Sequence, residues 1–330
     1  MNIKKVLRLS ACLILIAITV FCLAGCNGRA AVVMENAGVS DGVFAYYLDK
    51  VLTDPSGYGL NGEASKKEAI DAAVKLCEEH IAVNSICREN GYRLTNLDKS
   101  SVATDTENYW GMFSAYYESI GMQKQDLTAV KENEAKRELI TEKLYGTNGK
   151  SPVKKEKLIK ALNSTRVGFK AITGYFTKID ESGVEVRCSG EERAEITKAF
   201  KEMAQRINNG EKIEALNREY NKSQGLTGAN KLSVIVISSD DTTYSDDFYA
   251  QVKKLKVGSA GVVELDDYIY VILRTDISSS SYLEMYSRDI LKYLKSGDVN
   301  KMIDEKIEQW GHAKRHSLSG IYSHVAQEHK

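Results

Sequence analysis

One amphipathic helix, set between extended segments, constrains the fold of this chain more than any other feature. Apolar residues recur at i, i+4, i+7 and i+11 as Ile196, Phe200, Met203 and Ile207, with charged residues between them. This spacing predicts a helix with a single buried face. The run 208–210, Asn-Asn-Gly, is a typical end for it because Asn and Gly tolerate the left-handed conformation.

The segments around this helix predict a small sheet. Residues 167–179, before it, are rich in β-branched and aromatic side chains, and a second short helix is expected over 211–220. Extended runs follow at 232–237, 262–265 and 268–273, with Asp-Asp between the last two as a hairpin turn. A further short helix precedes that hairpin. The order strand, helix, helix, strand, helix, hairpin predicts an α+β fold with helices on a mostly antiparallel sheet.

Three separate segments in this region resemble parvulin-type peptidyl-prolyl isomerases. The run Glu191-Glu192-Arg193-Ala194 and the run 209–220 are similar to that family's helix pair. Residues 248–258, ending Leu-Lys-Val-Gly, look like its next helix and turn, and 266–274 look like its closing strand. The resemblance implies a parvulin-like domain over 166–277.

The histidines of active parvulins are missing from the matching positions. The family places one His on the first strand and another on the last, beside an apolar shelf. Residues 166–275 contain no His, since all five lie at 80, 312, 316, 324 and 329. The resemblance aligns the first-strand position near Thr173 or Tyr175, the last-strand position with Tyr270, and a shelf residue with Phe248.

These substitutions bear on catalysis. Prolyl isomerisation has a barrier of about 20 kcal/mol and needs an apolar pocket that holds a twisted amide, but no covalent step. Without the His pair we expect isomerase activity to be weak or lost. An active isomerase with Tyr in place of His is the alternative, and Tyr175, Tyr270 and Phe248 are its candidate catalytic residues.

The first 26 residues have the pattern of a bacterial lipoprotein signal. Lys4, Lys5 and Arg8 precede an apolar run over 11–24 that is short for a membrane span. The run ends Leu-Ala-Gly-Cys, which predicts cleavage before Cys26 and lipid attachment to its sulfur. An ordinary secretory signal with a chance Cys is the alternative. We therefore expect a lipid-anchored protein on the extracytoplasmic face of a bacterial membrane.

Charge and cysteine usage exclude several function classes. The chain has 45 basic and 45 acidic residues, so nucleic-acid binding has no electrostatic support. The sequence contains no Gly-rich loop of the kind that cradles phosphates, so no nucleotide site is predicted. It also contains no Cys and His residues at the spacing of a zinc site. We expect no cofactor. Cys77, Cys87 and Cys188 remain beyond the signal; the first two lie about 15 Å apart on one predicted helix and cannot pair there.

Residues 27–39 are predicted to be a tether and entry strand, and residues 40–165 a helical domain. A capping box, Ser65 to Glu68, opens its long helix. Trp110 and Phe113 belong to an aromatic cluster that is either a grip for apolar peptide or core packing. Together with the turn at 121–127, this helical order resembles the N-terminal domain of the PrsA and SurA group of foldases and chaperones.

In that group a C-terminal helix returns to the helical domain. The resemblance implies the same for 278–310, so that the parvulin-like domain is an insertion in a SurA-N-like helical domain. Residues 311–330 hold four histidines without regular spacing. We expect a flexible, solvated tail there, with a metal-binding tail as the alternative.

The combined expectation is a membrane-anchored extracytoplasmic foldase or chaperone that binds unfolded, newly exported polypeptides. The residues expected to contact substrate are Phe248, Tyr175 and Tyr270, with Trp110 and Phe113 on the helical domain. The alternatives are an active parvulin-type isomerase and a non-catalytic envelope scaffold for one dedicated partner.

Overall fold

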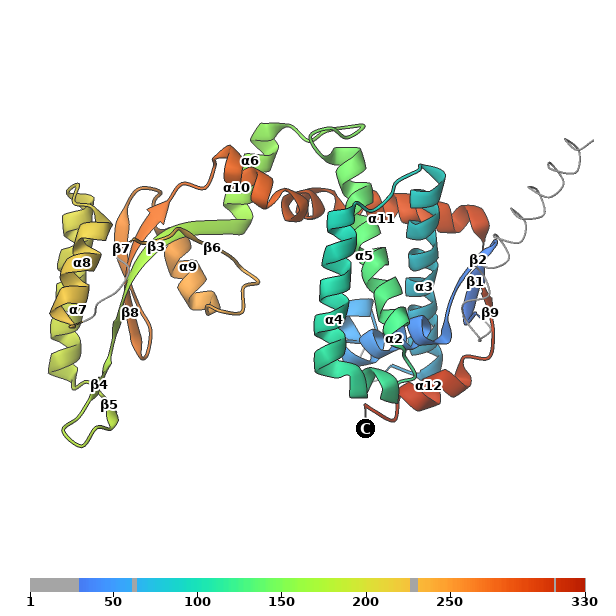
Figure 1. Cartoon of the computed structure of the whole chain (residues 1–330), viewed down its shortest axis with the longest axis horizontal. Coiled ribbons are helices and arrows are strands. Elements are labelled where there is room, and N and C mark those ends of the chain that lie inside the picture. Colours follow the sequence, from blue (N-terminus) through green and yellow to red (C-terminus); the bar gives the residue numbers. More distant parts are fainter. Residues whose placement is uncertain (1–29, 61–63, 226–230, 312, 330) are drawn as a thin grey trace, which may run out of the picture. The chain divides into compact units, whose positions relative to one another are not determined.

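A computed structural model describes residues 30–60, 64–225, 231–311 and 313–329 (Figure 1). The predicted signal segment and the lipidation site Cys26 lie outside these residues. The chain divides into two compact units. The helical unit comprises the chain up to Pro152 and from Lys295 onward, and the inserted unit runs from Val153 to Leu294.

The helical unit is built from four long helices. They are α2 (Asp41–Thr53), α3 (Lys66–Glu89), α4 (Asn96–Ser119) and α5 (Lys124–Tyr145). The predicted capping box is present at the start of α3, where Ser65 and Glu68 exchange hydrogen bonds. Helix α2 packs on α3, and α4 packs on α5. The second half of α11 (Ser287–Trp310) adds Val299 and Ile303 to a buried cluster with α3 and α5.

The strand predicted within 27–39 is present, and the tail contains structure that was not predicted. Strands β1 (Val32–Met34) and β2 (Ala37–Val39) lie within 27–39 and pair with β9 (Lys314–Arg315) in the antiparallel order β2-β1-β9. Helix α12 (Ser319–Val325) follows. Leu318 and Val325 are buried against α2 and α3, so the prediction of a solvated tail over 311–330 is wrong for its described residues.

The inserted unit begins with helix α6 (Lys155–Thr165), which starts three residues after Pro152. A four-stranded sheet has the order β6-β3-β8-β7, and all its pairs are antiparallel (Figure 1). Its strands are β3 (Arg166–Tyr175), β6 (Ile235–Ser238), β7 (Ala260–Glu264) and β8 (Tyr268–Thr275). A small hairpin of β4 (Thr177–Ile179) and β5 (Glu185–Arg187) follows β3, and α10 (Ser280–Met285) follows β8.

Helices cover both faces of this sheet. Helices α7 (Gly190–Asn208) and α8 (Ile213–Ser223) bury Phe200 and Leu216 against one face, together with Val271 of β8. Helix α9 (Asp246–Lys254) buries Phe248 against the other face, beside Phe169. The α+β class and the predicted order of elements are therefore correct, while the β4–β5 hairpin was not expected.

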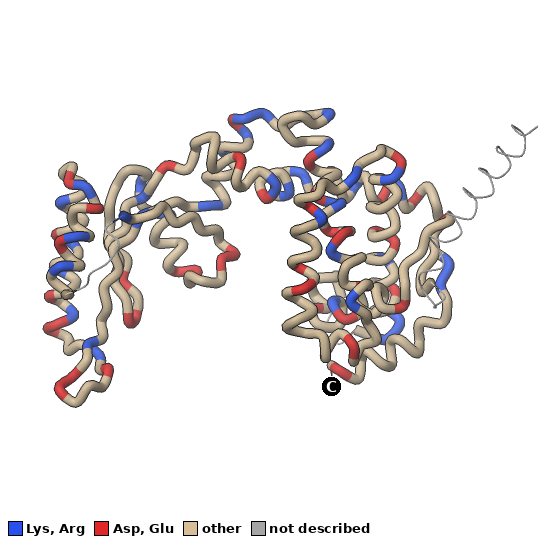
Figure 2. The backbone as a smooth tube through the Cα atoms, viewed as in Figure 1, with Lys and Arg blue, Asp and Glu red and all other residues tan. Residues whose placement is uncertain are grey.

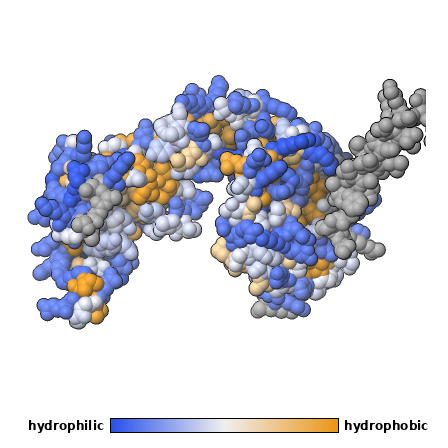
Figure 3. Space-filling view, viewed as in Figure 1, coloured by the Kyte–Doolittle hydropathy of each residue, from blue (hydrophilic) through white to orange (hydrophobic). Residues whose placement is uncertain are grey.

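The surface of the inserted unit combines mixed charge with apolar residues at one tip. Basic and acidic residues alternate along α7 and α8 (Figure 2). At the end of the β4–β5 hairpin, Ile179 and Val184 are 66% and 56% exposed, and the apolar colour at this tip is visible in Figure 3. Among the described residues, no helix combines the length and apolarity that a membrane span requires.

Candidate functional site

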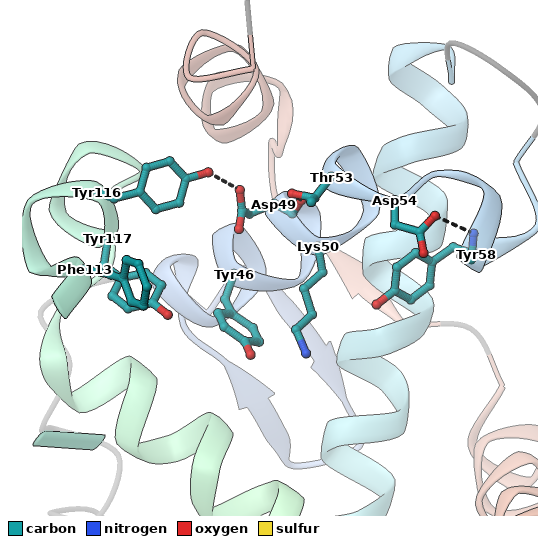
Figure 4. A pocket seen from close by; sticks show the side chains of 10 residues that line it. Tyr46, Asp49, Lys50, Thr53, Asp54, Tyr58, Phe113, Tyr116 and Tyr117 are labelled. Carbon is teal, nitrogen blue, oxygen red and sulfur yellow. Dashed lines mark hydrogen bonds between the residues drawn. The ribbon is translucent and has the colours of Figure 1, made fainter. Parts of the chain in front are cut away.

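The helical unit contains a pocket with mainly aromatic walls, which we call the aromatic pocket (Figure 4). It has a volume of about 560 Å³ and lies between α2, the turn after it, and the C-terminal half of α4. Its lining residues are Tyr46, Asp49, Lys50, Thr53, Asp54, Gly57, Tyr58, Phe113, Tyr116 and Tyr117.

Tyr117 forms the centre of the aromatic wall on α4. Its ring stacks on Trp110 with centroids 5.9 Å apart and meets Phe113 edge-on at 6.3 Å. Phe113 interrupts the helix with non-helical backbone angles of −129° and 15°, and its residue surface is 46% exposed. Of the two residues predicted to contact substrate here, Phe113 therefore lines the pocket, and Trp110 supports its wall without lining it.

Asp49 is the polar centre of the aromatic pocket. The Tyr116 hydroxyl donates to Oδ1 of Asp49 (Figure 4), and Nε2 of His329 lies 2.9 Å from the same oxygen. Burial, and secondly the bond to Asp49, raise the pKa of Tyr116, so its hydroxyl stays protonated. The end of the chain thus reaches a carboxylate that lines the pocket.

The other two charged lining residues differ in their partners. Lys50 Nζ lies 5.0 Å from the ring centroid of Tyr46 and 4.0 Å from Oε1 of Glu134, so its charge has a carboxylate partner outside the pocket lining. Asp54 accepts hydrogen bonds from the Gly57 amide and the Ser56 hydroxyl, at 3.0 and 2.9 Å. These two bonds lower the pKa of Asp54 and keep it ionised.

A second aromatic surface, the tyrosine row, consists of Tyr175, Tyr268 and Tyr270 on the sheet of the inserted unit. Tyr175 pairs with Tyr268 across β3 and β8, with ring centroids 5.6 Å apart, and Tyr268 stacks on Tyr270 at 6.3 Å. Tyr175 is 54% and Tyr268 43% exposed. Because residues two apart on a strand share a face, the rings of Tyr268 and Tyr270 lie on the side of the sheet that α9 covers. Tyr175, at the end of β3, also lines a pocket with Phe200 of α7 and Tyr220 of α8.

The positions that the sequence aligned with the parvulin histidines, Thr173 or Tyr175 and Tyr270, lie in or beside the tyrosine row. Thr173 and Tyr270 are direct partners in the register of β3 and β8. Partial burial raises the pKa of the Tyr270 hydroxyl, which therefore remains a neutral donor or acceptor. This pair therefore places two hydroxyl groups side by side on the sheet.

Phe248 is a correction to the predicted substrate contacts. Its side chain has no exposed surface. It stacks on Tyr244 at 4.7 Å and meets Phe169 and Tyr270 edge-on at 5.6 and 5.1 Å. It therefore supports the tyrosine row as core and does not itself contact a ligand in this conformation.

Other reactive side chains do not gather into a site in the part of the chain that the structure describes. No group of His, Cys, Asp and Glu among these residues has the arrangement of a metal site. Cys77 and Cys87 are buried free thiols on α3, and Cys188 is a half-buried free thiol after β5. Burial raises the pKa of the Cys77 thiol, which makes it unreactive.

Comparison with known proteins gives structural neighbours and no sequence family. No family model and no curated protein matches the chain. The foldase protein PrsA from Streptococcus pneumoniae has 14% identity and a TM-score of 0.39, with 90% of this chain and 100% of that chain covered. PrsA from Lactococcus lactis has 12% identity and a TM-score of 0.39, with 91% and 99% covered. PrsA from Bacillus subtilis has 12% identity and a TM-score of 0.32, with 78% and 90% covered. These neighbours bear the name of the group that the sequence resembles.

Proposed function

We propose that this protein is a membrane-anchored extracytoplasmic foldase or chaperone that binds unfolded, newly exported polypeptides and isomerises prolyl bonds weakly or not at all. The observation that carries the proposal is the pair of aromatic surfaces, one in each unit.

The aromatic surfaces suit unfolded chains because they combine apolar area with polar tips. A tyrosine or phenylalanine ring contacts many different side chains at a low cost in conformational entropy, and a tyrosine hydroxyl also bonds peptide groups. Phe113, Tyr175 and Tyr268 all keep between four and six tenths of their surface exposed. Exposed aromatic residues gathered in this way typically mark a binding surface.

Weak isomerase activity follows from the chemistry of the tyrosine row. A parvulin holds the twisted amide of the transition state in an apolar pocket with a polar network around it. Here Phe248, the expected shelf residue of such a pocket, is buried in contact with Tyr270 and Tyr244. Thr173 and Tyr270 supply hydroxyl groups, but residues 166–275 contain no imidazole.

The extracytoplasmic location rests on the sequence alone. The lipoprotein motif that ends at Cys26 predicts a diacylglyceryl anchor, and acyl chains contribute about 0.8 kcal/mol for each buried CH₂ group. A chaperone held at that surface meets polypeptides as they emerge from the membrane, and its binding sites need no nucleotide.

Two assays on one protein preparation test the proposal. The first measures suppression of aggregation of a denatured protein that lacks cis-proline, and the second measures proline-limited refolding. We expect suppression at stoichiometric amounts and little acceleration of refolding. Replacing Phe113 or Tyr175 by Ala should weaken suppression, while Tyr293→Ala, at a residue that is 62% exposed but outside both surfaces, should not.

The outcomes separate the alternatives. Acceleration of refolding at catalytic concentration would show an active isomerase and reject the proposed loss. Absence of suppression, together with capture of one stoichiometric envelope protein, would instead support a dedicated scaffold.

A further inference from the structure

The lining of the aromatic pocket has the composition of a receptor for a positively charged side chain. Its walls carry the rings of Tyr46, Tyr58, Phe113, Tyr116 and Tyr117. A Lys or Arg cation is attracted to the negative face of such rings, and more strongly when the site is partly dehydrated. A carboxylate beside the rings adds charge-assisted hydrogen bonds.

The charges of the lining favour a cation over an anion. Asp49 and Asp54 contribute two carboxylates, and hydrogen bonds from Gly57 and Ser56 hold Asp54 in its ionised form. The only lining cation among the described residues is Lys50. Its Nζ lies 4.0 Å from Oε1 of Glu134 and 5.0 Å from the ring centroid of Tyr46. In Figure 4 the side chains of Lys50 and Tyr46 point the same way from α2. The pocket lining therefore carries two carboxylates against one ammonium group, and that ammonium group already lies near Glu134.

The chain itself already places a basic group at this carboxylate. His329 lies 2.9 Å from Oδ1 of Asp49, although 280 residues separate the two in sequence. The segment that carries it is fixed by α12, whose Val325 is buried and which packs on α2. An imidazole from the end of the chain thus occupies the position that a ligand's nitrogen donor would take.

We propose that the aromatic pocket binds Lys or Arg side chains of unfolded polypeptide segments, and that His329 holds the same position on Asp49 until such a side chain displaces it. This inference rests on the proposed function and adds the class of segment that the helical unit prefers. An arginine fits best, because its planar guanidinium stacks on aromatic rings and offers several donors to one carboxylate. The aliphatic stem then packs on Phe113 and Tyr117, while an apolar neighbour in the peptide contacts the exposed part of the α4 wall.

The binding of two matched peptides to the full chain tests this inference. Both are fluorescein-labelled, unstructured decapeptides with two Phe residues; one contains Arg at the centre and the other citrulline, its neutral counterpart of nearly equal shape. Fluorescence anisotropy should show about tenfold tighter binding of the Arg peptide. Asp49→Asn should remove most of this difference, whereas Asp304→Asn, an exposed acid on α11 away from the pocket, should leave it unchanged.

His329 gives a second test that does not depend on a buried group. His329 lies beyond the end of α12 and its side chain is 23% exposed, so its replacement by Ala should leave the fold intact. If it competes for Asp49, His329→Ala should tighten binding of the Arg peptide by up to about fivefold, the value of one typical hydrogen bond, and have no effect on the citrulline peptide. Equal tightening for both peptides would overturn the assigned competition.

The results distinguish this inference from the proposed function. Equal binding of both peptides by the wild-type protein would reject the preference for a cation while leaving the chaperone proposal in place. Binding of neither peptide would reject both. If free N-acetylargininamide displaced the peptide at the peptide's own concentration, the pocket would be a site for a small cation, and the assignment to polypeptide segments would be wrong.

Discussion

The buried imidazole of His80 makes the helical unit sensitive to mild acid, and the effect can be calculated. His80 lies on α3, is 6% exposed, and shares a hydrogen bond of 3.0 Å between its Nδ1 and the Tyr47 hydroxyl on α2. Burial, and secondly the charge of Lys136, lower its pKa from 6.5 to about 4. At a pH between these two pKa values, His80 is therefore mostly neutral in the folded protein and mostly protonated in the unfolded chain.

The sign of the effect follows from proton binding in the two states. Between pH 6.5 and about 4 the unfolded state binds more protons at this residue, so stability falls as the pH falls. Above pH 6.5 neither state is protonated and the contribution is constant. At 1.36 kcal/mol per pKa unit, the loss at pH 4.5 is about 2.5 kcal/mol. Tyr47 belongs to the helix that carries Asp49 and Lys50, so the weakened packing of α2 also affects the aromatic pocket.

Urea denaturation followed by tryptophan fluorescence measures this loss of stability in the helical unit. Both tryptophans of the chain, Trp110 and Trp310, belong to the helical unit. Other groups also titrate in this range, so the informative quantity is the difference between wild-type protein and His80→Gln. The wild type should lose about 2.5 kcal/mol more than the variant between pH 7.5 and 4.5.

A matched replacement in the same unit controls for the loss of an imidazole as such. His324 is an exposed residue of α12, and His324→Gln should behave as the wild type does. Equal losses in the wild type and His80→Gln would refute the reasoning, since they would mean that the buried ring takes up its proton without unfolding.

Three further predictions concern buried groups. Phe248→Ala should destabilise the inserted unit by about 3–5 kcal/mol, because the side chain is fully buried among aromatic rings; the near-UV circular dichroism of its tyrosines during denaturation measures this. Gly174→Ala should destabilise the same unit by about 1–3 kcal/mol, because the added Cβ would lie 2.3 Å from Cζ of Phe200, and wild-type stability would contradict the packing described. In the native protein a thiol reagent should label the half-buried Cys188 but reach Cys77 only after unfolding, which mass spectrometry of the labelled peptides would show.

The parts of the fold that were predictable are those set by neighbours in sequence. The apolar spacing from Ile196 to Ile207 gave α7 nearly to its ends, and Gly210, with φ of +101°, lies just beyond it. The capping box at Ser65 gave the start of α3. The hairpin of β7 and β8 followed from two β-branched runs separated by a short polar turn.

The tail was mispredicted although its sequence carries a usable signal. Besides its irregularly spaced histidines, the tail carries the apolar residues Leu318, Ile321 and Val325, which are spaced i, i+3 and i+7. This spacing is that of a helix with one buried face, and Leu318 and Val325 are indeed buried.

The candidate sites were less predictable because they depend on contacts distant in sequence. The aromatic pocket joins α2 to α4, and its central bond links Asp49 to Tyr116, 67 residues away. No local pattern marks either residue. Distant contacts also explain why the prediction for Phe248 was wrong. The resemblance suggested a shelf residue that contacts substrate, whereas the ring packs against Tyr244 and Tyr270 and is fully buried.

The junction between the two units has a consequence for how such a protein can change. The chain leaves the helical unit after Pro152 and re-enters it at Lys295. Close to these two points, Lys295 Nζ lies 4.6 Å from the ring centroid of Tyr145. Within the inserted unit the first and last segments also meet, through a bond of 3.0 Å from Asn163 to Ser278. A module with adjoining ends can be shortened, exchanged or deleted at a small cost in loop entropy. A change within the inserted unit therefore puts no strain on the helical unit, which lets the two units evolve at separate rates.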